Sequence, residues 1–143
     1  MNTFTNQRVL PAEAAAIFAA IRNPERLARW WGPAGFSNRF EIFEFVPGGR
    51  WVFDMIGPDG TVYPNESTFE RIVADGEVVI RHSCAPLFTL SITLTPAPGG
   101  TLLRWEQRFD DPALAEALRP IIEPANEENL DRLTHELAST LHS

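Results

Sequence analysis

The chain has 143 residues, of which 44% are hydrophobic and 22% charged, and its 12 basic and 19 acidic residues give a formal net charge of −7. This length and composition predict a single globular domain over residues 1–143, with enough apolar residues for a sizeable core. The acidic charge excludes nucleic acid and membrane surfaces as expected partners, because phosphate backbones and anionic lipids repel such a protein.

Cysteine usage and the absence of targeting segments bound the expected compartment. Cys84 is the only cysteine, so no internal disulfide can form and a reducing environment suits the chain. The sequence carries neither a signal peptide nor an apolar run of the roughly 18 residues that span a bilayer. These features predict a cytoplasmic protein.

The first part of the chain predicts one strand followed by two helices. Residues 3–10 form the strand candidate, and the Ala-rich run 13–21 places apolar side chains on one helical face. Asn23-Pro24 suits the start of a second helix, with Asn23 as N-cap and Pro24 in the first turn. That helix is expected to end at Gly32-Pro33, because proline cannot continue it.

Six further strands follow, separated by turn signals such as Gly48-Gly49 and Asp75-Gly76. Several of these strands alternate apolar and polar residues, which is typical of a sheet with one buried and one solvated face. Pro64-Asn65 interrupts the third of them and predicts a bulge or an edge position there. The predicted strands cover residues 40–46, 50–56, 61–72, 78–82, 88–95 and 103–109.

The chain ends in a helical region that Asp110-Asp111-Pro112 would cap and that Pro120 and Pro124 are expected to divide. Its last part, 125–141, is long enough to lie across a sheet, at about 25 Å and 1.5 Å per residue. The order of elements predicts an α+β fold: a curved antiparallel sheet of six or seven strands, two short helices after the first strand, and a cavity closed by the long C-terminal helix. One apolar stripe is formed by Leu130, Leu133, Leu137 and Leu141.

Six short motifs, in order along nearly the whole chain, carry a resemblance to a known family. They are Pro11 before an Ala-rich helix with Phe18, 27–33 (LARWWGP), 44–51 (EFVPGGRW), 55–60 (MIGPDG), 63–67 (YPNES) and 125–133 (ANEENLDRL). The chain resembles the START-like (SRPBCC) superfamily with the helix-grip fold, and within it the activator of Hsp90 ATPase homologue (AHSA1-like) family.

The resemblance implies a pocket between the long helix and the sheet. Members of the wider superfamily bind lipids, hormones or polyketides, and some are cyclases. The resemblance does not imply one activity, because a fold of this kind hosts unrelated functions. Only the eukaryotic co-chaperone of the family is tied to Hsp90, and no feature of this sequence supports a chaperone partner.

Large apolar side chains at strand spacing belong either to the core or to the lining of a ligand pocket. We expect a mixture, with Ile17, Phe18 and Leu133 in the core. The apolar residues predicted to line the pocket are Trp30, Trp31, Phe36, Trp51, Phe53, Met55, Tyr63, Phe69, Phe88, Leu90 and Trp105.

Polar residues on the predicted inward faces are further candidates for the pocket. Gln107 lies between Trp105 and Phe109, and His82 ends a strand whose apolar residues share its face. A buried polar group must be hydrogen-bonded, so each of the two is either satisfied within the protein or orients the polar end of a ligand. Glu66 follows the Pro64-Asn65 kink and is either turned inward by a bulge or solvated at an edge.

His82 and Glu66 are the catalytic candidates if the protein is an enzyme. A histidine titrates near neutral pH, and a buried carboxyl group gains a raised pKa, so the two could act as base and acid. Cys84 stands beside His82 as His-x-Cys, but two ligands do not complete a zinc site, and we expect no metal. We expect no cofactor, since neither a P-loop nor a G-x-G-x-x-G motif occurs.

Three functions stay open. We favour a binding protein for a small apolar or amphipathic molecule, held against the aromatic wall and oriented by one or two polar groups. The first alternative is a cyclase-type or hydrolase-type enzyme that uses the same cavity. The second is an Hsp90-associated or regulatory module that acts through its surface. Exposed edge strands also allow a homodimer.

Overall fold

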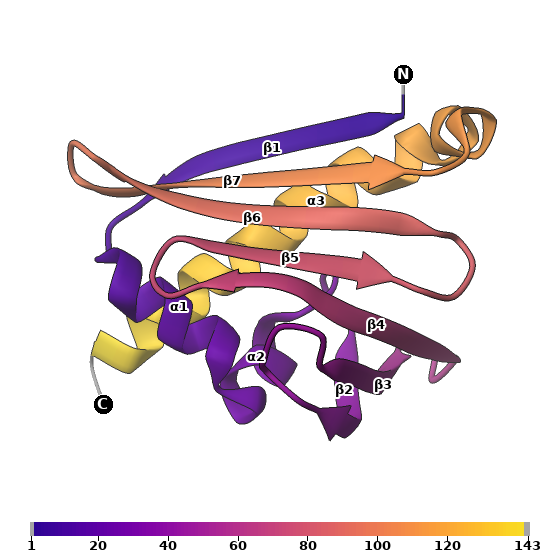
Figure 1. The fold of residues 1–143 in the computed structure, drawn as a ribbon, viewed down its shortest axis with the longest axis horizontal. Helices are drawn as coiled ribbons and strands as arrows, with labels where there is room; N and C mark the ends of the chain where they lie inside the picture. The colour runs from indigo at the N-terminus through magenta and orange to yellow at the C-terminus, as the bar shows by residue number, and fades with distance from the viewer. Residues whose placement is uncertain (1, 142–143) are drawn as a thin grey trace.

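A computed structural model describes residues 2–141, which form one antiparallel sheet with helices packed on one of its faces (Figure 1). The predicted α+β fold is confirmed. The helices are α1 (Ala14–Arg22), α2 (Pro24–Trp30) and α3 (Pro112–Leu141). The strands are β1 (Thr3–Leu10), β2 (Ser37–Phe43), β3 (Arg50–Ile56), β4 (Val62–Val73), β5 (Glu77–His82), β6 (Phe88–Ala97) and β7 (Gly100–Phe109).

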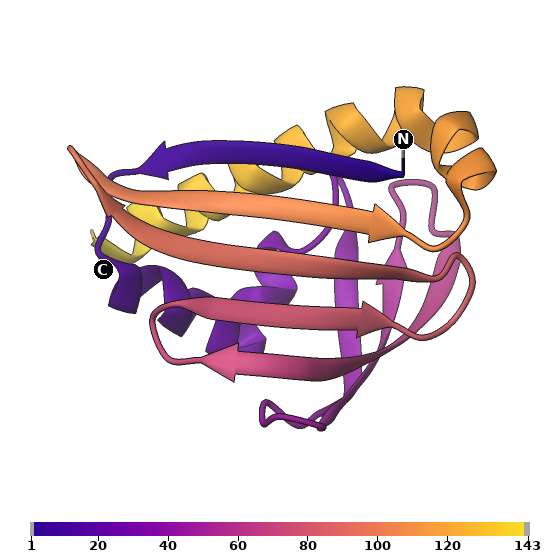
Figure 2. The ribbon, with the colours of Figure 1, turned by 45° about the horizontal axis from the view of Figure 1, so that its top comes forward.

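The sheet has the order β1-β7-β6-β5-β4-β3-β2. Strands β2 to β7 follow one another as antiparallel neighbours, and β1 pairs with β7, which brings the start of the chain beside its last strand. The twist of each strand accumulates across the sheet. Figure 2 shows the result, with β2 and β3 running almost across the direction of β1, β7 and β6. The curved sheet therefore has one concave face, and the helices lie on it.

The two prolines in the last helix do not divide it, contrary to the prediction. α3 runs through Pro120 and Pro124 as one element of 30 residues. Each proline removes one backbone N–H donor from the helix. Both prolines are exposed, so water can bind the carbonyl groups that lose their partners, and the helix continues.

The prediction of a bulge or an edge position at Pro64-Asn65 is confirmed in its second form. Pro64 pairs with Asp54 of β3 without a register shift, so the strand has no bulge at this point. Pairing of β4 with β5 begins only at Ser67, which leaves Pro64 with a neighbour on one side and confirms the edge position. The irregularity of β4 lies farther along, between Phe69 and Arg71.

The core fills the space between the concave face and the three helices. Ile17, Phe18 and Leu133 are buried there, as predicted, and Leu130 and Leu137 of the same α3 stripe join them. The side chain of Leu141 and all of His142 lie outside the described residues. In the described part of the chain, no helix combines the length and apolarity needed to cross a membrane.

Polar contacts fix the short helices against α3. The Asn23 side chain accepts from the backbone N–H groups of Glu25 and Arg26 and so caps α2, as predicted. Glu136 of α3 is 7% exposed and accepts hydrogen bonds from Arg29 at 2.9 Å and Arg26 at 3.0 Å. These bonds, with that of Arg29 foremost, hold the pKa of Glu136 below its usual value. The start of the domain is thereby tied to its last helix.

Candidate ligand-binding cavity

A cavity of about 460 Å³ lies between the concave face of the sheet and the middle of α3. Inward-facing side chains of β3 to β7 form one wall, and α3 forms the opposite one. The sides are segment 31–36, which joins α2 to β2, and loop 83–87, which joins β5 to β6. Cavities of this size are typical of small-molecule sites.

The sheet wall of the cavity is apolar because of strand alternation. Leu90 of β6 and Trp105 of β7 point inward and are 2% and 3% exposed. The residues next to each of them along its own strand point to the outer face. The ring of Trp31 lies 5.5 Å from that of Trp105. Within residues 2–141, the Nε1 of Trp105 has no hydrogen-bond partner, which leaves a buried donor in this wall.

Arg132 of α3 holds segment 31–36 in place as one side of the cavity. Its guanidinium donates to five backbone carbonyls at 2.6 to 3.0 Å. Burial lowers the pKa of Arg132, and the ring of carbonyl oxygens stabilises the charge. The five acceptors belong to Arg29, Trp31, Gly32, Pro33 and Phe36.

Asn129, one turn earlier on α3, completes this anchorage. Its Nδ2 donates to the carbonyl of Trp30 at 2.8 Å, and its Oδ1 accepts from the N–H of Gly32 at 3.2 Å. Gly32 has a φ of +94°, and a Cβ there would lie 2.8 Å from the Met55 side chain. The close approach of this segment to the sheet therefore requires glycine.

A second amide of α3 reaches the sheet. Asn126 donates from Nδ2 to Oε1 of Gln107 at 3.1 Å. The two residues are 8% and 7% exposed, and both line the cavity. This contact joins the helix wall of the cavity to the sheet wall, two residues beyond Trp105 on β7.

His82 forms a polar corner at the end of β5. Its Nδ1 lies 2.7 Å from the Pro86 carbonyl, which can only accept, so Nδ1 carries a proton. Its Nε2 lies 2.8 Å from Oδ1 of Asn65 and 3.5 Å from Sγ of Cys84. The ring stacks on Phe88 at 4.4 Å. Burial lowers the pKa of His82 from its usual value.

Sequence comparison decides the family. The model of the family described as "Activator of Hsp90 ATPase homolog 1-like protein" matches residues 11–141. The chain belongs to this family. No curated protein matches the chain in sequence. The resemblance found in the six sequence motifs is thereby confirmed.

Solved structures share the fold of this AHSA1-like chain. A protein from Nitrosomonas europaea has a TM-score of 0.87 at 18% identity, covering 97% of this chain and 96% of its own. A protein from Arthrobacter aurescens has a TM-score of 0.87 at 22% identity, covering 96% and 86%. The AHSA1 protein from Silicibacter pomeroyi has a TM-score of 0.80 at 20% identity, covering 96% and 99%. The TM-scores establish a shared fold, and the low identities carry no information about a ligand.

Nine of the predicted pocket residues lie around the cavity of this AHSA1-like domain. They come from segment 31–36 and from all five strands β3 to β7, so the fold brings together residues up to 76 positions apart, from Trp31 to Gln107. Tyr63 is 47% exposed and lies at the rim, whereas Trp105 is buried. The nine are Trp31, Phe36, Met55, Tyr63, His82, Phe88, Leu90, Trp105 and Gln107.

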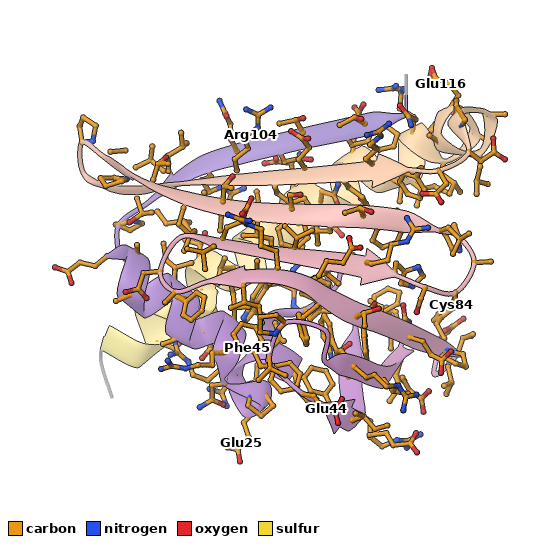
Figure 3. All side chains as sticks on the ribbon, in the orientation of Figure 1. Glu25, Glu44, Phe45, Cys84, Arg104 and Glu116 are labelled. Carbon is orange, nitrogen blue, oxygen red and sulfur yellow. The ribbon has the colours of Figure 1, made fainter. Side chains whose placement is uncertain are left out.

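Four predicted lining residues belong to the core instead, which corrects the prediction. Trp51, Phe53 and Phe69 do face inward, but farther along the sheet, where other aromatic rings cover them. The ring centroid of Phe45, for example, lies 5.0 Å from that of Phe69, and Figure 3 shows Phe45 well apart from Cys84, which follows β5. Trp30 is 1% exposed and donates from Nε1 to the Ala20 carbonyl.

Glu66 is a further correction. Its side chain is exposed on the outer face of the sheet, with Oε1 3.8 Å from a guanidinium nitrogen of Arg50. The regular pairing of β3 with β4 leaves no bulge to turn it inward. Asn65, the residue before it, faces inward and contacts His82. The two proposed catalytic groups, His82 and Glu66, therefore lie on opposite faces of the sheet.

Sequence reasoning missed the helix wall, to which Ile122, Asn126 and Asn129 contribute. These residues precede Leu133 at spacings of 11, 7 and 4, so they extend the buried leucine stripe toward the start of α3. Two asparagines on an otherwise apolar helical face were the signal that could have identified them.

A wider groove of about 1000 Å³ lies on the other side of α3, between α2, β2 and the end of α3. Its charged side chains are engaged in structural contacts: Arg132 with backbone carbonyls, and Glu136 with Arg29. Residues such as Asp131 and His135 at its edge are exposed. Among the described residues, no group of three or more His, Cys, Asp or Glu side chains is placed to hold a metal ion.

Proposed function

We propose that this AHSA1-like domain binds one small, largely apolar molecule in the cavity between the sheet and α3. The observation that carries the proposal is the cavity itself, about 460 Å³ between the sheet and α3 and lined mainly by apolar side chains. The cavity opens to solvent at a rim that includes Tyr63 and Ile121, so a small molecule can enter it, and its volume lies in the range of ligand pockets.

The lining supports an apolar ligand. Leu90, Trp105 and Phe88 offer apolar surface, and burial of about 200 Å² of ligand against it contributes roughly 5 kcal/mol. Among residues 2–141, no Asp, Glu, Lys or Arg lines the cavity. A charged ligand would be buried without a counter-charge, at a large cost. The free Cys84 thiol also suits a cytoplasmic site of action, which we include in the proposal.

A cavity-filling variant tests the proposal. Ala125 lines the cavity and is partly buried, so Ala125→Trp places an indole in the ligand's space. Ala138 on the same helix is exposed, and Ala138→Trp is the matched control.

A thermal-shift screen against apolar and amphipathic metabolites is expected to give hits with the natural chain and with Ala138→Trp, but none with Ala125→Trp. A ligand present at 100 times its Kd stabilises the folded state by roughly 2.7 kcal/mol, which shifts the melting temperature by several degrees. Hits that survive Ala125→Trp would place binding outside the cavity and contradict the proposal.

A further inference from the structure

Two buried amides face each other across the cavity with part of their hydrogen-bonding capacity unused. Asn126 donates to Gln107, and within residues 2–141 neither side chain makes another hydrogen bond. This leaves Nε2 of Gln107 as a free donor and Oδ1 of Asn126 as a free acceptor. Neither atom is sealed off from solvent, so both are open to the cavity that the two residues line.

The free donor and acceptor do not depend on how the amides are oriented. If both amides were turned over, Gln107 would donate to Asn126, and the unused atoms would be Oε1 of Gln107 and Nδ2 of Asn126. In either arrangement one amide NH2 group and one amide oxygen of the pair have no hydrogen-bond partner within residues 2–141. A ligand group that both accepts and donates can bind both of these atoms.

Asn129 shows that this open capacity is specific to one turn of α3. It is also buried, at 6% exposed, and also lines the cavity. Its oxygen and its nitrogen are both bound to the backbone of residues 30–32. Of these two asparagines, therefore, Asn126 is the one placed to bind a ligand.

We propose that the cavity selects an uncharged, largely apolar molecule whose single polar end is a hydroxyl or a carboxamide bound by Gln107 and Asn126. This inference rests on the proposed function, that the cavity binds a small molecule. The apolar body of the ligand lies against Leu90 and Trp105, which flank Gln107 on the sheet. The carboxamide and the hydroxyl share the required chemistry, since each donates and accepts at one position.

Four naphthalene probes of similar size test the proposal. Naphthamide and naphthylmethanol donate and accept, methylnaphthalene does neither, and naphthoate is charged. Calorimetric titration of the full chain is expected to show the amide or the alcohol binding at least roughly tenfold more tightly than methylnaphthalene, because two added hydrogen bonds are worth about that factor. Naphthoate is expected to bind most weakly, and the ranking of amide against alcohol identifies the preferred group.

A double variant, Gln107→Met with Asn126→Leu, removes both amides and keeps the volume of the side chains. It is expected to bind methylnaphthalene as before and to lose the preference for the amide and the alcohol. Gln7→Met, an exposed position on β1, is the matched control and is expected to keep the preference.

The outcomes separate the two proposals. Equal affinities for the three uncharged probes, or a preference that survives in the double variant, overturn the inference and leave the cavity as a purely apolar site. If none of the four probes binds, the result contradicts both the proposed function and this inference. If the double variant does not fold, the ranking of the probes on the natural chain decides.

Discussion

Two neighbouring turns of α3 carry buried polar side chains against the same cavity, and they differ in how completely these are satisfied. In one turn, the side chains of Asn129 and Arg132 form hydrogen bonds with backbone groups of residues 29–36. The turn with Asn126 makes one bond, to Gln107, and leaves a donor and an acceptor open. The first turn fixes one side of the cavity, whereas the second leaves polar atoms open toward the cavity.

The difference shows how to separate structural from functional polar residues without a bound ligand. Buried polar groups in folded proteins are almost always hydrogen-bonded. A saturated group such as Asn129 is explained by the fold alone. The pair of Gln107 and Asn126 keeps a donor and an acceptor open, and both side chains line the adjoining cavity.

The largest expected effect is on Arg132. Arg132→Met keeps the packing of the side chain but deprives five carbonyls of their donor, so we expect a loss of about 3 kcal/mol or more in the free energy of unfolding. Urea denaturation measures it. Arg104→Met is the control, since Arg104 is exposed and pairs with Glu106 on the same strand; its expected loss is below about 1 kcal/mol. Similar losses in both variants would contradict the structural role of Arg132.

Asn129→Leu against Asn126→Leu compares the two turns directly. The first variant leaves the Trp30 carbonyl and the Gly32 N–H unpaired, with an expected loss of about 2 kcal/mol, whereas the second is expected to cost less than about 1 kcal/mol. Chemical denaturation of the two variants side by side provides the measurement. A greater loss for Asn126→Leu would reverse the assignment of roles.

The His82 corner predicts a smaller, pH-dependent effect. Because burial lowers the pKa of His82 in the folded state, the unfolded chain binds more protons below about pH 6.5. Stability is therefore at its full value above that pH and falls as the pH drops toward the folded pKa. The ring contacts Asn65, Cys84, Phe88 and the Pro86 carbonyl, and the positive charge of Arg81 lowers the pKa of His82 further.

Melting temperatures at pH 7 and pH 5 test this linkage. The fall between the two is expected to shrink in His82→Asn and to stay unchanged in His135→Asn, where the histidine is exposed. An unchanged fall in His82→Asn would mean that another group is responsible.

The smallest effect is expected at Glu66. Since its carboxylate is exposed and faces Arg50, Glu66→Gln is expected to change stability by less than about 0.5 kcal/mol and to leave ligand affinity unchanged. The thermal-shift screen described above measures both. A loss of ligand binding in this variant would return Glu66 to the site and restore the acid–base pair with His82.

The sequence predicted the faces of the strands better than the positions along them. Alternation identifies Trp51 and Trp105 as inward-facing. It does not show that the rings of Phe40 and Phe43 pack against Trp51, whereas Trp105 lies beside the cavity. That distinction depends on where α3 crosses the curved sheet, which is a property of the whole fold.

Glu66 and Asn126 show a second limit of the sequence. The kink predicted at Pro64 did not determine whether the Glu66 side chain points to the inner or the outer face of the sheet. Only the register of β3 with β4 determines it. Asn126 lies on the helical face that Leu130 and Leu133 continue, so its burial could be predicted. Its partner could not, because Gln107 becomes its neighbour only through the packing of α3 on β7.

Contacts between ligand protons and the tryptophan rings test the central claim most directly. An intermolecular NOE experiment with naphthamide, or with a hit from the screen, is expected to show contacts to Trp105 and Trp31, which line the cavity, and none to Trp51 or Trp30, which the core covers. The four indoles serve as each other's controls. Contacts confined to exposed residues outside the cavity, with none to Trp105 or Trp31, would contradict the account.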